Sequence, residues 1–253
     1  MSKQKIDLQK MEKWKKRVYD KYASTMGQSG KREEEMDKTI APQLPYIESI
    51  IHKHIPSKRQ TRIVDVGCGD GTWLYVLKQK GYENISGADV SQEQVKLARE
   101  KGVEEVEIAD GQEYLEGMAS NTVDVVLMID VLEHLTRQEL FNTADEVYRV
   151  LSGGGRCIAH VPNAGGIFSM DVRYGDLTHE VAFTPSSIKQ LYSTVGFSRV
   201  SCFEDKPVPH GFVSFLRRIV WEVGTVPFRL LEASETGNFD AVLSRNMIAI
   251  AVK

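Results

Sequence analysis

From residue 62 onwards, short apolar runs alternate with longer segments in which the apolar positions recur with helical spacing. The apolar runs have strand length and the segments between them have helix length. The predicted strands are 62–66, 85–89, 106–109, 123–128 and 156–161, and the predicted intervening helices are 72–80, 92–101 and 138–151. This order predicts an α/β domain in which helices cover both faces of a mostly parallel sheet.

The two ends of the chain follow other patterns. Residues 6–55 read as helices broken near 26–30, which predicts an N-terminal helical cap over residues 1–60 and a main domain over 61–253. After residue 162 comes a glycine-bearing insert to 184, and Thr184-Pro185-Ser186 predicts a helix over 185–195. Residues 199–203 and 246–252 are predicted as the last two strands.

Between these last strands, residues 210–232 are rich in large apolar side chains, with Arg217, Arg218 and Arg229 interspersed. We expect an apolar helical segment here. It would cover an acceptor pocket, form the face of a homodimer or lie on a membrane surface. The first two roles are favoured, because apolar helical stripes more often pack against protein.

Composition narrows the class of protein. The 253 residues are 42% hydrophobic and 26% charged, with a formal net charge of −3, so nothing in the balance calls for a nucleic acid partner. Residues 1–60 hold 14 Lys and Arg against 8 Asp and Glu, and such a basic arm suits an anionic acceptor or a solvated face. Three scattered cysteines, an N-terminus without an apolar leader and the lack of a long apolar run predict a cytoplasmic protein with no transmembrane segment.

One segment carries the first chemical signal. Residues 63–74 read Ile-Val-Asp-Val-Gly-Cys-Gly-Asp-Gly-Thr-Trp-Leu, a buried strand that runs through a glycine turn into a helix. Glycines allow the backbone to approach a ligand closely, and the helix N-terminus offers free amide donors. Asp89 and Asp110 close the next two predicted strands, where one carboxylate can accept ribose hydroxyls and the other can reach an adenine amino group.

These residues resemble the class I S-adenosylmethionine-dependent methyltransferases over about residues 60–200. Their first motif, D-x-G-x-G-x-G, is matched by Asp65, Gly67, Gly69 and Gly71. The dinucleotide-binding fingerprint of dehydrogenases, G-x-G-x-x-G, is not matched, because the third glycine comes one residue early. The resemblance implies a Rossmann-like, seven-stranded sheet with an antiparallel last strand. It implies binding of S-adenosylmethionine by the following residues: Asp65, Gly67, Gly69, Asp89, Val90, Asp110, Gly111 and Ile129.

The predicted fourth strand is followed by Asp130-Val131-Leu132-Glu133-His134. If residues 130–134 form a helical turn, Asp130, Glu133 and His134 share one face and can hold an ion. His179, in the insert, is a fourth candidate. This arrangement resembles the ubiquinone-pathway O-methyltransferases and the small-RNA 2′-O-methyltransferases, which implies a divalent metal such as Mg²⁺ or Mn²⁺ at the acceptor hydroxyl.

Other functions stay open at this point. Without a metal, His134 or His179 would act as the general base beside Glu133, or His134 would line the cofactor pocket. The stretch from 161 to 185 also resembles methyltransferases of surface-polysaccharide and sugar-modifying pathways, which implies a sugar or phosphorylated small molecule as acceptor. N-methylation of a small amine, RNA 2′-O-methylation and a non-catalytic cofactor-binding protein are the alternatives.

Overall fold

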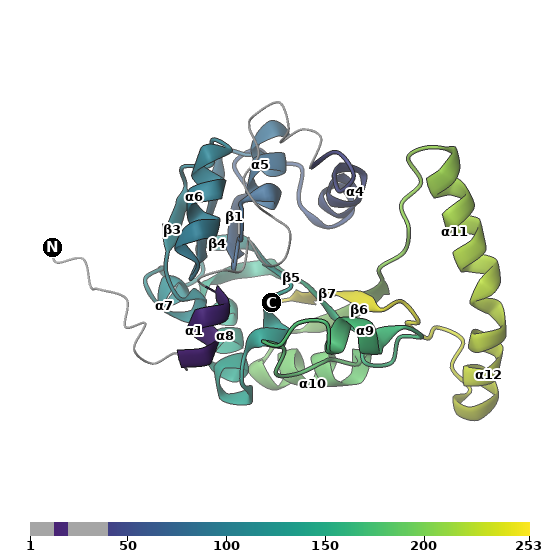
Figure 1. Ribbon diagram of the computed structural model, residues 1–253. Coiled ribbons are helices and arrows are strands. Elements are labelled where there is room, and N and C mark those ends of the chain that lie inside the picture. The colour runs from purple at the N-terminus through teal and green to yellow at the C-terminus, as the bar shows by residue number, and fades with distance from the viewer. Residues whose placement is uncertain (1–12, 20–39) are drawn as a thin grey trace, which may run out of the picture.

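The computed structural model describes residues 13–19 and 40–253, which form one seven-stranded sheet with helices on both sides (Figure 1). The strands are β1 Arg62–Val66, β2 Asn84–Asp89, β3 Val106–Ile108, β4 Val123–Ile129, β5 Leu151–Pro162, β6 Arg199–Glu204 and β7 Asn246–Val252. The helices are α1 Lys13–Tyr19, α4 Leu44–His54, α5 Thr72–Gln79, α6 Gln92–Glu100, α7 Gly111–Glu116, the 3₁₀ turn η1 Leu132–His134, α8 Arg137–Val150, α9 Ser169–Arg173, α10 Pro185–Val195, α11 Phe212–Gly224 and α12 Val226–Thr236.

The strand order is β3-β2-β1-β4-β5-β7-β6, and β7 runs antiparallel to both of its neighbours. The predicted α/β class, the seven strands and the antiparallel last strand are therefore confirmed. Two strands begin earlier than predicted. The strand β2 starts at Asn84 instead of residue 85, and β5 starts at Leu151 instead of residue 156, because Leu151 pairs with Val123 directly after α8 ends. A register shift between Val123 and Val125 then accommodates the glycines that follow.

Alternate residues of the central strands feed two apolar cores, one on each face of the sheet. Val64 and Val66 face the core formed with α7, α8 and α10, whereas Ile63 faces the core formed with α4, α5 and α6. The helix α4 belongs to this second core through Ile47, Ile50 and Ile51. Helices thus cover both faces of the sheet. Ligands can bind at the edge formed by the carboxyl ends of the strands.

The predicted break at residues 26–30 lies outside the described residues, so only α1 and α4 represent the N-terminal segment. The predicted apolar segment 210–232 is helical, as α11 and α12, which stand in one column beside the edge strand β6 (Figure 1). No helix within residues 13–19 and 40–253 combines the length and apolarity that crossing a membrane requires.

Candidate active site

The glycine turn after β1 crosses the carboxyl end of the sheet. Gly67 has a φ of +71°, and a Cβ placed on it would lie 2.5 Å from Cγ2 of Val131, so the turn packs tightly against the segment after β4. Gly69 also has a positive φ, +53°, but a Cβ there would meet nothing within 4 Å. The backbone at Gly69 is therefore open to a ligand, while Gly67 is held by its neighbour.

Asp89 at the end of β2 fixes this turn. Its Oδ2 accepts a hydrogen bond from the backbone N–H of Gly69 at 2.9 Å, and its Oδ1 accepts one from Ser91 at 2.8 Å. Burial raises the pKa of this carboxyl group, an effect that the two backbone donors oppose. Each oxygen keeps a free lone pair, so a pair of ribose hydroxyls fits this carboxylate.

Asp65 lies on β1 beneath the same turn, with its side chain 1% exposed. Neither carboxylate oxygen has a hydrogen-bond partner among the described residues. Burial, and after it the nearby charge of Asp89, raises the pKa of Asp65 well above its usual value. A buried carboxyl group without a partner is costly, and a cationic ligand group such as the ammonium of S-adenosylmethionine would compensate it. The residues at this edge therefore fit the cofactor.

The remaining predicted cofactor residues follow the ends of neighbouring strands. Val90 comes directly after β2, Asp110 and Gly111 follow β3, and Ile129 ends β4. The order β3-β2-β1-β4 brings these ends to one edge of the sheet. Asp110 also caps α7, because its Oδ1 accepts hydrogen bonds from the backbone of Gln112 and Glu113.

Beside this edge, Glu133, His134 and His179 form a compact cluster. One potential ligand atom from each residue lies within 4.8 Å of the others, and the two imidazole rings are 4.7 Å apart. The insert reaches the turn η1 through backbone hydrogen bonds, since Glu180 and Val181 both donate to the carbonyl oxygen of Glu133. Three of the four predicted metal ligands are thus brought together by backbone pairing between the turn η1 and the insert.

A chain of polar contacts orients His134. The Thr178 hydroxyl donates to Asp176 Oδ1 at 2.6 Å, so its oxygen is free to accept from His134 Nδ1, 2.7 Å away. We assign the ring proton to Nδ1 on this basis, which leaves the Nε2 lone pair available to a ligand. Burial, and next the charge of His179, lowers the pKa of His134 to about 4, so the ring is neutral near pH 7.

Glu133 is 1% exposed, and its Oε2 has no partner among the described residues, as is also true of His179 Nδ1. Burial and then the charge of Asp130 raise the pKa of Glu133 well above its usual value. A buried carboxyl oxygen without a partner, beside two imidazoles, fits a divalent cation, which would supply the missing partner.

Asp130 departs from the predicted arrangement. The helical turn begins at Leu132, and Asp130 lies outside it with a φ of +55°, so the prediction that Asp130 shares one helical face with Glu133 and His134 is wrong. Its Oδ1 instead contacts His160 Nδ1 at 2.6 Å, and His160 Nε2 lies 3.3 Å from Asp205 Oδ2. Burial opposes the charge of His160, but Asp130 and Asp205 together raise its pKa well above the usual value.

Sequence reasoning missed several residues of this region. His160 was the one polar residue inside an apolar strand end, and that was a signal for a buried role. Lys15 on α1 could not be placed by spacing at all. Its Nζ donates to the carbonyl oxygen of His134 at 3.2 Å and pairs with Glu180 at 2.8 Å, so α1 lies against the cluster of Glu133, His134 and His179.

Of three cations in the N-terminal and α11 segments, two are held in ion pairs. Lys15 pairs with Glu180, and Arg218 pairs with Glu222 on its own helix. Arg217 is exposed on α11. Arg217 is thus the one of these three cations for which no ion pair is seen among the described residues.

Comparison with known proteins agrees with this geometry. Residues 64–159 match a family model described as a methyltransferase domain. Norajmaline N-methyltransferase of Rauvolfia serpentina is 35% identical over 105 residues, which are 39% of this chain and only 35% of that enzyme. The chain therefore matches about a third of the length of this curated relative.

Solved structures share the fold. A methyltransferase from Archaeoglobus fulgidus that depends on S-adenosylmethionine superposes with a TM-score of 0.63 at 20% identity, over 86% of this chain and 98% of that one. A possible histamine N-methyltransferase from Thermotoga maritima gives 0.56 at 17% identity, over 87% and 97%. A putative O-methyltransferase from Nostoc punctiforme gives 0.58 at 17% identity, over 93% and 60%.

The glycine turn and the strand order resemble those of class I S-adenosylmethionine-dependent methyltransferases, and residues 64–159 match the model of a methyltransferase domain. Within that class, the matched relatives include both N- and O-methyltransferases by name. The names of these relatives therefore do not distinguish an oxygen acceptor from a nitrogen acceptor.

Replacing Asp89 by asparagine is expected to weaken binding of S-adenosylmethionine. Loss of charge-assisted hydrogen bonds to the ribose costs about 2 kcal/mol, or roughly thirtyfold in Kd. Calorimetry with S-adenosylhomocysteine measures this directly. Asp124→Asn is the matched control, because Asp124 sits at the amino end of the strands and binds the backbone of Arg62. Equal affinities for wild type and Asp89→Asn would contradict the ribose role.

Proposed function

We propose that this protein transfers the methyl group of S-adenosylmethionine to a hydroxyl of a small molecule, a sugar or phosphorylated metabolite, with a divalent metal ion at the acceptor. The observation that carries the proposal is the convergence of Glu133, His134 and His179, which each place one potential ligand atom within 4.8 Å of the others. Glu133 Oε2 and His179 Nδ1 also lack a hydrogen-bond partner among the described residues. Hydroxyls are poor nucleophiles near pH 7, and a Mg²⁺ or Mn²⁺ ion lowers their pKa.

In this proposal the two halves of the site have separate tasks. Asp65, Gly69 and Asp89 bind the cofactor, whose sulfonium makes the methyl group electrophilic. Glu133, His134 and His179 hold the ion, and Asp130 remains with His160 instead of serving as the fourth ligand. Most of the rate would come from holding the acceptor oxygen in line with the methyl group, since the sulfonium needs no further activation.

N-methylation of a small amine is the second candidate. The name of the Rauvolfia enzyme favours it, since that relative is an N-methyltransferase. The acidic side chains of Asp130 and Glu133 would then bind the ammonium of the acceptor, and neutral His134 would accept its proton. In this case no metal is needed at the cluster.

A paired-acceptor assay tests the proposal. The full chain is incubated with ¹³C-methyl S-adenosylmethionine and pools of phosphorylated sugars, each matched with its amino-sugar counterpart. The ¹³C chemical shift of the transferred methyl group distinguishes an ether from an amine. We expect methyl ethers, formed faster with added Mg²⁺ or Mn²⁺. Methylated amines as the only products would replace the proposal by the second candidate.

A further inference from the structure

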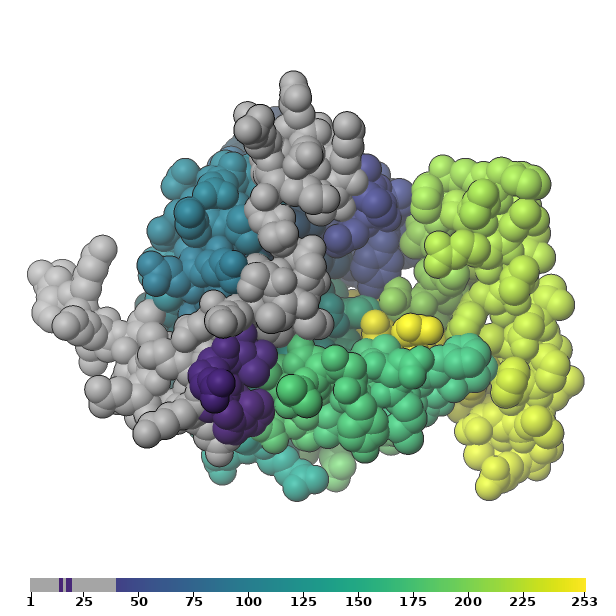
Figure 2. Space-filling view, viewed as in Figure 1, coloured from purple at the N-terminus to yellow at the C-terminus, as the bar shows by residue number. Residues whose placement is uncertain are grey.

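Helices α11 and α12 turn their apolar sides to the solvent. Eleven large apolar side chains on them are each at least 42% exposed, and no residue that the structure describes covers them. We call this surface the α11–α12 face. It comprises Phe212, Val213, Phe215, Leu216, Ile219, Val220, Val223, Val226, Phe228, Leu230 and Leu231. The two helices form a block at the side of the molecule (Figure 2).

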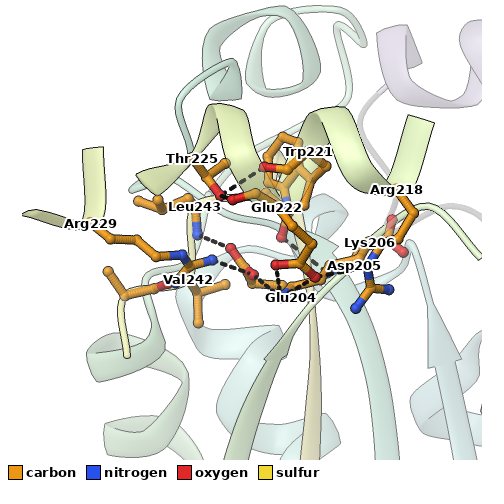
Figure 3. A network of polar contacts seen from close by, with 12 residues as sticks. Glu204, Asp205, Lys206, Arg218, Trp221, Glu222, Thr225, Arg229, Val242 and Leu243 are labelled. Carbon is orange, nitrogen blue, oxygen red and sulfur yellow. Dashed lines mark hydrogen bonds and ion pairs between the residues drawn. The ribbon is translucent and has the colours of Figure 1, made fainter. Parts of the chain in front are cut away.

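The polar sides of the same helices are fixed against the body. Glu222 on α11 accepts from Lys206 at 3.1 Å and from Arg218 at 2.7 Å (Figure 3). Arg229 on α12 binds Glu204 at 2.6 Å, and Glu204, at the end of β6, is only 7% exposed. An amphipathic helix ordinarily buries its apolar side. Here the charge pairs hold the polar sides of α11 and α12 against the body, so their apolar sides face the solvent.

The size of this face corresponds to an interface. At roughly 100 Å² for each partly exposed large side chain, the patch is on the order of 1,000 Å². Monomeric proteins seldom expose apolar patches above about 600 Å², whereas a stable dimer buries about 800 Å² on each partner. A partner is therefore required, and its chemistry can be inferred from the charges around the patch.

Those charges favour a second copy of the chain over a lipid surface. The exposed ionic groups near the face are Arg217 on α11 and Glu232 and Glu235 on α12, a mixture of signs. The other cations of the segment, Lys206, Arg218 and Arg229, are neutralised by Glu204 and Glu222. Helices that bind anionic membranes keep more free cations than free anions. On α11 and α12 the one free cation, Arg217, is outnumbered by Glu232 and Glu235.

The lengths and charges of the two helices would allow this face to pair with the same face of a second copy. The helices have 13 and 11 residues, and Gly224 lies at their junction with open space where a side chain would be. A two-fold axis near Gly224 sets α11 of one copy antiparallel to α12 of the other. This arrangement brings Arg217 towards Glu232 and Glu235 of the second copy and allows close backbone approach at the axis.

We propose that the α11–α12 face joins two copies of this chain in a two-fold symmetric dimer, with apolar contacts at its centre and Arg217 opposite the acidic end of α12. The proposal is independent of which acceptor is methylated. Sedimentation velocity over a concentration series tests it on the full chain, whose monomer mass is 28.5 kDa.

We expect wild type to sediment as a dimer and Val220→Glu to shift it to the monomer, with the dimer Kd raised about tenfold or more. Val220 is 70% exposed, so folding should be unaffected, and circular dichroism verifies this. Phe141→Glu is the matched control, because Phe141 is an exposed apolar residue of α8, off the face. Arg217→Glu and Glu232→Arg should each weaken the dimer, and the two together should restore it.

Three results would overturn the proposal. The first is a wild-type protein that remains monomeric at all concentrations, and the second is a Val220→Glu variant as dimeric as wild type. The third is cosedimentation of monomeric wild type with phosphatidylglycerol vesicles that Val220→Glu abolishes, which would assign the face to a membrane. Failure of the double charge reversal to restore association would reject the antiparallel arrangement.

Discussion

Removing divalent metal by exhaustive chelation is expected to reduce methyl transfer at least a hundredfold, and added Mg²⁺ or Mn²⁺ should restore it. Replacement of His179 by alanine should produce the same loss without rescue. The reason is that the acceptor hydroxyl would lose the ion that lowers its pKa and fixes its position. Binding of S-adenosylhomocysteine should persist in both cases, because Asp65, Gly69 and Asp89 lie in the other half of the site.

Two controls sharpen this experiment. His52→Ala removes an exposed histidine of α4 and should leave both activity and rescue unchanged. Calorimetry of Mn²⁺ with wild type and His179→Ala measures the ion itself, and the heat of binding should disappear in the variant. Full activity after chelation, combined with inactivity of His179→Ala, would instead indicate metal-free base catalysis by the histidines.

The affinity of Glu133, His134 and His179 for a divalent ion should depend on pH. Burial raises the pKa of Glu133, so protons compete with the ion for this carboxyl group up to a higher pH than at an ordinary glutamate. His134, whose pKa is lowered to about 4 by burial and by His179, is already neutral near pH 7 and competes little. Proton competition for the ion should therefore be stronger at Glu133 than at His134.

The strands and the cofactor half of the site could be predicted because their signals are local. Residues 62–74 contain the strand, the glycine turn and the helix start in one continuous segment, and β1 has the predicted bounds. Asp89 follows from its position at a strand end. In each case the physical cause, burial or backbone conformation, acts on neighbours in sequence.

The acceptor half could be predicted only in part because long-range contacts decide it. Asp130 was assigned to a helical turn by spacing, yet its positive φ and its bond to His160 depend on β5, 30 residues away. The partner Asp205 comes from beyond β6, a further 45 residues along. Residue spacing predicts which side chains of one helix or strand share a face. It does not predict which side chains other elements bring to the same place.

The end of β6 contacts both helix α12 and the region of His160, which lie far apart in the sequence. Glu204 anchors the α11–α12 face through Arg229 and Lys206, and the next residue, Asp205, contacts His160 beside the acceptor cluster. The two adjacent residues Glu204 and Asp205 thus contact α12 on one side and His160, at the carboxyl edge of the sheet, on the other. A displacement of this segment would act on both.

Replacing Asp65 by asparagine is expected to stabilise the free protein and to weaken the binding of S-adenosylmethionine. The carboxyl group is buried without a partner among the described residues, so an amide of the same shape removes an electrostatic cost of about 1–2 kcal/mol. The folded-state pKa of Asp65 is raised, so the group destabilises the fold increasingly as pH rises above its unfolded value of about 4. The gain from Asp65→Asn should accordingly be small below pH 4 and grow towards neutral pH.

Thermal unfolding at several pH values, with and without cofactor, measures both effects. Without ligand, Asp65→Asn should unfold a few degrees higher than wild type at pH 7. With saturating S-adenosylmethionine the difference should shrink or reverse, because the wild type alone offers a carboxylate to the cationic cofactor. Asp124→Asn is the control, since both Asp124 oxygens accept hydrogen bonds and its loss should destabilise. A variant less stable than wild type in the free state would show that Asp65 serves the fold, which leaves Asp89 as the principal acid for the cofactor.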